Sequence, residues 1–268
     1  MRAAEKHMDE ILRRICERGC VLMIDFDGTL APIVSDPRRA RMGMRTRHAL
    51  EVVARRYPVA IVTGRALSDA QSRVPIRGVS FAGNHGLERS MKGRIHRVRI
   101  PAILQRALGT VRARLRSVAR DYKGIYFEDK VYSLSLHYRR LPRAKHAVIR
   151  AEVMDAAREA GGLRVMEGIY VLNILPGVRR DKGTAAREMY TSLAGRKKPV
   201  PVFIGDDVTD EDAFRVLRKG ITIKVGKSNA SAARYYFRSR ANVDSFLYAL
   251  SKLARSPASL EVSAGERK

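Results

Sequence analysis

The sequence is poor in cysteine and in aromatic residues. It has no Trp, aromatic residues make up 6% of it, and Cys16 and Cys20 are its two cysteines. Without further cysteines or a matching pair of histidines, these two thiols do not form a zinc site. Thiols outside any metal site or disulfide framework are typical of a reducing compartment, so we expect reduced cysteines in a cytoplasmic protein.

Long hydrophobic runs are also absent. No stretch approaches the roughly 18 apolar residues that a membrane-spanning helix needs. Residues 1–19 carry charges throughout and contain no apolar segment as long as a signal-peptide core. We therefore expect a soluble protein without a membrane partner.

Acidic residues are scarce relative to basic ones. The chain has 53 Lys and Arg residues against 27 Asp and Glu residues, which gives a net charge of +26. Such a surplus attracts nucleic acid, anionic lipid or a phosphorylated metabolite. The basic residues are spread along predicted helices such as 106–120, however, and do not alternate with aromatic residues on one element. This pattern favours a solvated basic surface, and nucleic acid is not expected as a partner.

Short apolar runs alternate with helical segments over most of the chain. Continuous β-branched runs of this kind are typical of parallel strands that are buried on both faces. They predict a doubly wound, Rossmann-like α/β core, preceded by an amphipathic helix over 3–18. The expected strands are 21–24, 59–62, 79–82, 202–204 and 221–225.

The middle of the chain follows a different rhythm. A predicted helix at 101–120 precedes strands with period-two alternation, a second helix at about 143–160 and two more strands, which indicates an inserted unit with an antiparallel sheet. We expect a catalytic core over 1–99 and 178–268 and an inserted α/β cap over 100–177. The polar tail from Ser256 is expected to be frayed.

Polar residues stand at the ends of three of the predicted parallel strands. Asp25, Thr63 and Asp206 follow the first, second and fourth run, directly or after one glycine. Ligands bind at the carboxyl ends of such strands, so these residues should converge in one crevice. The segments concerned are Asp25–Phe26–Asp27, Thr63–Gly64–Arg65 and Gly205–Asp206–Asp207.

The converged residues suit a hard cation and phosphoryl transfer. The carboxylates of Asp25 and Asp206 and the backbone carbonyl of Asp27 form an oxygen set suited to Mg²⁺, with Asp210 in support. Carboxylates this close repel one another unless a cation holds them. Asp25 is then placed to attack phosphorus and Asp27 to act as general acid and base, while Thr63 and Lys182 neutralise the phosphate oxygens.

The motifs resemble those of the haloacid dehalogenase-type phosphatases. The segments DFDGTLAPI (25–33), TGR (63–65), DKG (181–183) and GDDVTDEDAF (205–214) are similar to the four motifs of that superfamily in order and spacing. Within that superfamily, roughly residues 20–250 of this chain resemble the trehalose-6-phosphate phosphatase family. The family-level segments are AGNHGLE (82–88), EDKVYSLSLHYR (128–139) and IKVG (223–226).

This resemblance implies a Mg²⁺-dependent phosphatase acting on a small sugar phosphate, trehalose 6-phosphate, through an aspartyl-phosphate. The sequence does not give the oligomeric state, and a monomer is our expectation. It assigns Asp25 as nucleophile and metal ligand and Asp27 as acid and base with its carbonyl on the metal. The remaining implied assignments are Thr63 and Lys182 on the phosphoryl group, Asp206 and Asp210 at the metal, Glu128 and Lys130 on the sugar from the cap, and Gly64, Arg65, Asn84, His85 and Gly86 in substrate binding from the core.

The chain departs from the family at one place. Asn173 and Leu175 stand where the family often carries the Glu and Arg of a Glu-x-Arg-Pro segment. This leaves room for another glycosyl phosphate, such as sucrose 6-phosphate or mannosyl-3-phosphoglycerate. A non-catalytic nucleic-acid-binding protein on the same scaffold is the alternative from another functional class.

Overall fold

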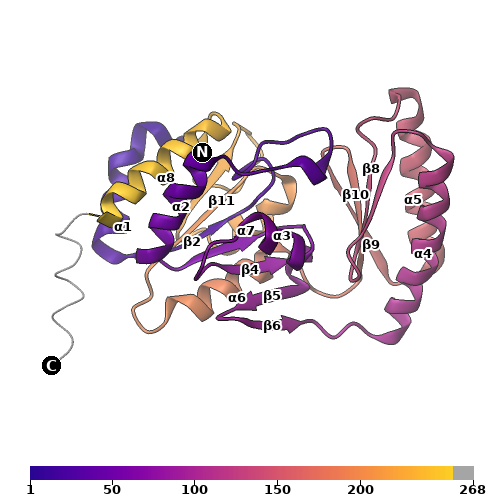
Figure 1. The fold of residues 1–268 in the computed structure, drawn as a ribbon, viewed down its shortest axis with the longest axis horizontal. Coiled ribbons are helices and arrows are strands. Elements are labelled where there is room, and N and C mark those ends of the chain that lie inside the picture. The colour runs from indigo at the N-terminus through magenta and orange to yellow at the C-terminus, as the bar shows by residue number, and fades with distance from the viewer. Residues whose placement is uncertain (256–268) are drawn as a thin grey trace. The chain divides into compact units, whose positions relative to one another are not determined.

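The computed structural model describes residues 1–255, so the tail expected to be frayed from Ser256 lies outside the described residues. The chain divides into two compact units, which are described separately (Figure 1). The first unit comprises residues 1–96 and the chain from Arg180 onward, and the second comprises Arg97–Arg179.

The first unit contains a nine-stranded sheet. Its strands run parallel from β1 through to β4, and β5 is antiparallel to β4. All five predicted parallel strands are present within this sheet. In sheet order the strands are β1 (Arg2–Ala3), β13 (Tyr235–Phe237), β12 (Ile221–Val225), β11 (Val200–Gly205), β2 (Cys20–Ile24), β3 (Val59–Val62), β4 (Ser80–Gly83), β5 (Glu88–Met91) and β6 (Arg94–Arg97).

Helices cover both faces of this sheet, as a doubly wound fold requires. Leu22 and Ile24 of β2 pack in one core with α1, α2 and α8, which lie together in Figure 1. Val21 and Met23 of the same strand pack in a second core with α6 and α7. This alternation confirms that the apolar run buries both of its faces. The helices are α1 (Met8–Arg18), α2 (Met44–Arg56), α3 (Leu67–Arg73), α6 (Lys182–Ala194), α7 (Glu211–Val216) and α8 (Arg240–Arg255), with 3₁₀ turns η1 (Ala4–His7), η2 (Pro37–Arg39), η3 (Asn84–Gly86) and η5 (Val208–Asp210).

The predicted N-terminal helix begins later than expected. Residues 3–7 are not α-helical, because Arg2–Ala3 form β1 beside β13 and the backbone N–H of Arg2 donates to the carbonyl of Arg234 at 2.9 Å. Pairing at the sheet edge therefore overrides the helical pattern. Within α1, Ile11 and Ile15 are buried, in keeping with the amphipathic pattern.

The second unit is a four-stranded antiparallel sheet with two helices on one face, the predicted α/β arrangement. Leu134, Leu136, Leu172 and Ile174 pack against the helices in one core. The alternate residues of the same strands therefore lie on the opposite face. The elements are α4 (Ala102–Asp121), β7 (Tyr126–Asp129), β8 (Leu134–His137), η4 (Arg143–Lys145), α5 (His146–Ala160), β9 (Leu163–Gly168) and β10 (Val171–Pro176).

Three arginines of α4 pair with carboxylates of their own unit. Arg112 and Arg116 contact Asp129, and Arg114 contacts Glu159 at 2.8 Å.

Throughout residues 1–255, each helix is either too short or too polar to cross a lipid bilayer.

Candidate active site

Three carboxylates meet at the carboxyl ends of the central strands. Strand β2 lies between β11 and β3, and the backbone N–H of Asp25 donates to the carbonyl of Ile204 at 2.9 Å. Asp25, Asp206 and Asp210 each present an oxygen within 4.8 Å of the others. Four residues were predicted as metal ligands. The structure brings together the carboxylates of three of them, all except Asp27.

Lys182 lies within this cluster because of the way α6 begins. Asp181 caps the helix by accepting a hydrogen bond from the backbone N–H of Thr184 at 2.7 Å, which fixes the first turn. The Nζ of Lys182 is then 2.9 Å from Asp25 Oδ2 and 2.8 Å from Asp210 Oδ1. One buried ammonium therefore serves two buried carboxylates.

The charges of the cluster do not balance. Burial raises the pKa of Asp25 well above its ordinary value and Asp210 and Asp206 raise it further, against the opposing effect of Lys182. Burial likewise raises the pKa of Asp206 to about 7, with Asp210 contributing. The pKa of Lys182 is raised, because the attraction of Asp210 and Asp25 outweighs the effect of its burial. Three carboxylates around one ammonium thus leave an excess of negative charge, which a further cation would neutralise.

The local backbone holds the oxygens in position. Thr29 Oγ1 donates to Asp206 Oδ1 at 2.9 Å, and the backbone N–H of Asp207 donates to Asp210 Oδ2 at 2.9 Å. Gly28, with φ +76°, makes room for Asp206, because a Cβ at Gly28 would lie 2.0 Å from Asp206 Oδ2. A preset group of carboxylate oxygens fits a hard divalent cation.

Asp27 points its carboxylate at Arg65 rather than into the cluster. Both oxygens of Asp27 accept hydrogen bonds from the Arg65 guanidinium at 2.6 Å. Arg65 also donates to Asp69 Oδ2 at 2.7 Å, and its guanidinium lies over the Phe26 ring. Arg73 donates to the same Asp69 oxygen at 2.8 Å. Arg65, expected in substrate binding, is thus held between two carboxylates, and the sequence pattern did not reveal Asp69.

Thr63 and Gly64 lie beside His85. Thr63 is buried. Its Oγ1 accepts a hydrogen bond from the backbone N–H of Arg65 at 3.2 Å, and its backbone carbonyl accepts one from the backbone N–H of His85, also at 3.2 Å. A Cβ at Gly64 would lie 2.6 Å from the His85 ring, so Gly64 lets the imidazole pack against the TGR segment. Thr63, Gly64 and His85 are therefore neighbours in the first unit.

Asn84 is anchored within the protein. Its Nδ2 donates to Glu88 Oε2 at 2.6 Å, and the same carboxylate accepts the backbone N–H of Leu67 at 3.4 Å. Asn84 and His85 both have positive φ, 50° and 54°, in a turn completed by Gly86. Non-glycine residues seldom adopt this conformation, so the turn is strained.

The second unit carries Glu128 and Lys130 in one polar group. Glu128 Oε2 lies 3.2 Å from His137 Nε2 and 3.7 Å from Lys130 Nζ. Glu128 pairs with Ser135 across β7 and β8, so it lies on the sheet face opposite the helices. On that face Ser135 donates to Asn173 Oδ1 at 2.6 Å. The neutral residue at position 173 thus has a hydrogen-bond partner within its own unit.

Comparisons with known proteins all find trehalose-phosphatases similar to this chain. A family model described as trehalose-phosphatase matches residues 23–243. Trehalose 6-phosphate phosphatase RA3 of Zea mays is 35% identical over 262 residues, which cover 88% of this chain and 72% of that protein. The trehalose-phosphate phosphatase of Mycobacterium marinum is 33% identical over 267 residues, 92% of this chain and 67% of that protein.

Solved structures share the fold. The C-terminal domain of the C. albicans trehalose-6-phosphate phosphatase superposes with a TM-score of 0.80 at 20% identity, covering 91% of this chain and 96% of that one. The sucrose-phosphatase of Synechocystis gives a TM-score of 0.56 at 17% identity, with 88% and 98% covered.

Proposed function

The chain belongs to the trehalose-phosphatase family of phosphoric monoester hydrolases, and on that premise we propose that it hydrolyses trehalose 6-phosphate to trehalose and phosphate in trehalose biosynthesis. The observation that carries the proposal is the cluster of Asp25, Asp206 and Asp210 around the buried Lys182, which lies inside the matched region. A nucleic-acid-binding role would not need these clustered carboxylates.

We propose Mg²⁺ as the cofactor, held by the carboxylates of Asp25 and Asp206 and the main-chain carbonyl of Asp27, with Asp210 in support. The donor atoms of the cluster are all oxygens, the ligands that Mg²⁺ prefers. When bound, the ion supplies positive charge that favours approach of a phosphate dianion to a carboxylate.

The residues of the chain divide the reaction into two steps. A carboxylate oxygen of Asp25 attacks phosphorus, the bond to the sugar oxygen breaks, and Asp27 gives that oxygen its proton. Asp27 then takes a proton from water, which attacks the aspartyl-phosphate and releases phosphate and free Asp25. Thr63 and Lys182 hold the phosphoryl oxygens. Both oxygens of Asp27 contact Arg65 in the structure, so Asp27 must release one of these bonds to carry a proton.

From these bonds we propose that Arg65 positions the carboxylate of Asp27. Replacing Arg65 by Lys removes the two parallel bonds to Asp27, and we expect kcat to fall by about ten- to a hundredfold with KM little changed. Steady-state phosphate release measures both constants, and Arg47→Lys, in an exposed pair with Glu51, is the control. A rise in KM at unchanged kcat would instead assign Arg65 to direct substrate binding.

We propose that Glu128 and Lys130 bind the glucosyl hydroxyls, with Asn84, His85, Gly64 and Gly86 contributing. In the Glu128→Gln variant we expect kcat/KM for trehalose 6-phosphate to fall by about ten- to a hundredfold, because a charged acceptor is lost. Hydrolysis of p-nitrophenyl phosphate, which has no sugar, should be unaffected.

The matched control is Glu159→Gln, an exposed carboxylate of the same unit that pairs with Arg114. If Glu128→Gln slowed both substrates equally, Glu128 would act on the fold or the chemistry and not on the sugar.

A substrate panel tests the function. We expect the highest kcat/KM for trehalose 6-phosphate, ahead of sucrose 6-phosphate and mannosyl-3-phosphoglycerate, and loss of activity when divalent cations are chelated. A higher value for either rival would assign the enzyme to that sugar phosphate. We further propose that the enzyme works in the cytoplasm, in keeping with the free thiols of Cys16 and Cys20. We also propose that it works as a monomer.

A further inference from the structure

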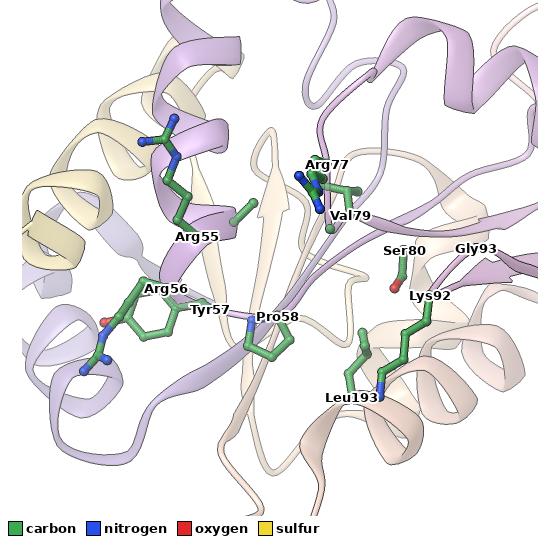
Figure 2. Close-up of a pocket in the computed structure, with 12 residues that line it drawn as sticks. Arg55, Arg56, Tyr57, Pro58, Arg77, Val79, Ser80, Lys92, Gly93 and Leu193 are labelled. Atoms are coloured by element: carbon green, nitrogen blue, oxygen red, sulfur yellow. The ribbon is translucent and has the colours of Figure 1, made fainter. Parts of the chain in front are cut away.

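A basic hollow, here called the basal pocket, lies at the amino ends of β3 and β4. It has a volume of about 620 Å³ and is bordered by the end of α2, the loop before β4, the β5–β6 turn and Leu193 of α6 (Figure 2). Pro58 and Ser80 of its lining precede or begin these strands, whereas Thr63 and Asn84 follow their other ends. The basal pocket is therefore separate from the catalytic crevice.

The charged side chains that line the basal pocket are all basic. Arg55, Arg77 and Lys92 line it and are exposed, and no carboxylate is among its lining residues. Figure 2 places Arg55 and Arg77 on two sides of the hollow and Lys92 on the side of Leu193. Within residues 1–255, none of these three cations forms an ion pair with a carboxylate. Their potential is therefore available to an anion.

The walls between these cations are apolar and open. Pro58, Val79 and Leu193 line the hollow beside Tyr57. The β5–β6 turn has φ 48° at Lys92 and 76° at Gly93, the signs of a tight hairpin turn, and a Cβ at Gly93 would meet nothing within 4 Å. The volume falls in the range of roughly 300–1,000 Å³ of small-molecule sites and exceeds what inorganic phosphate alone would fill.

We propose that the basal pocket is a second anion site, which binds the phosphate group of a small organic phosphate between Arg55 and Arg77 and packs its apolar part against Pro58 and Leu193, where Lys92 adds positive potential. Charge-assisted bonds from the guanidinium groups would provide most of the affinity. This site goes beyond the proposed function, because it involves none of the catalytic residues.

Amide chemical shifts of the full chain test the proposal, with phenylphosphonate as a probe that a phosphatase cannot hydrolyse. At constant ionic strength, we expect saturable shifts at Gly78 and Gly93, at lower concentrations than with inorganic phosphate, and none with benzyl alcohol. The Arg55→Gln/Arg77→Gln variant should bind at least about tenfold more weakly in this pocket. Shifts at Gly28 and Gly64 report the catalytic crevice separately and show that the variant is folded.

The charge-matched control is Arg13→Gln/Arg18→Gln, which removes two exposed cations from α1. Absence of saturable shifts at Gly78 and Gly93, or shifts that persist in the Arg55→Gln/Arg77→Gln variant, would overturn the proposal. Equal weakening by the control pair would also overturn it, since it would trace binding to the net charge.

Discussion

Replacing Asp25 by Asn is expected to lower kcat by at least about 10⁴-fold while the protein stays folded. The amide nitrogen and oxygen cannot attack phosphorus as a carboxylate does, so no aspartyl-phosphate forms. The substitution keeps the shape of the side chain. It also removes the charge of one of three clustered carboxylates that repel one another, as the raised pKa of Asp25 indicates. The free energy of unfolding should therefore be retained or increased in the absence of metal.

Phosphate release from trehalose 6-phosphate and urea unfolding measure the two effects. Asp9→Asn, at an exposed position of α1, is the control and should change neither quantity. Residual activity above about one hundredth of the original would show that Asp25 is not the nucleophile.

Replacing Lys182 by Met is expected to impair both stability and catalysis. The ammonium is the shared partner of Asp25 and Asp210, all three groups being buried. Removing one partner of a buried ion pair costs about 3–5 kcal/mol of unfolding free energy, because the other charges are left uncompensated. The phosphoryl group also loses its buried cation, so we expect kcat/KM to fall by about 10²-fold or more.

Mg²⁺ should stabilise the Lys182→Met variant more than the original protein. A ligand that binds only the folded state raises its stability, and the carboxylates left without the ammonium attract the cation more strongly. Urea unfolding with and without Mg²⁺ gives this comparison. The control is Lys227→Met, at an exposed lysine. An unfolding free energy equal to that of the original protein would contradict the role of Lys182 as the neutralising partner.

The central sheet was predictable because its strands are buried on both faces. Runs such as 21–24 and 59–62 are apolar at every position, a pattern that the sequence displays directly. The edge strands were missed for the opposite reason. β5 and β6 read ERSM and RIHR, without a consistent alternation, and β1 has two residues, so neighbouring strands rather than local pattern define them.

The positions of Asp25 and Asp206 were predictable because these residues directly follow strands of that sheet. Their orientations were not. The pairing of Arg65 with Asp27 and Asp69 depends on where α3 begins relative to the turn after β2, a tertiary relation with no local sequence signal. The bond from Asn84 to Glu88 likewise requires the left-handed turn at η3.

The central claim is that Asp25 receives the phosphoryl group of trehalose 6-phosphate, and rapid acid quenching with peptide mass spectrometry tests it most directly. During turnover with Mg²⁺, the account predicts a transient phosphoryl group on the peptide containing Asp25, formed at the rate of trehalose release. It should be absent in the Asp25→Asn variant. Release of trehalose and phosphate without any phosphorylated Asp25, or with phosphate on another residue, would contradict the account.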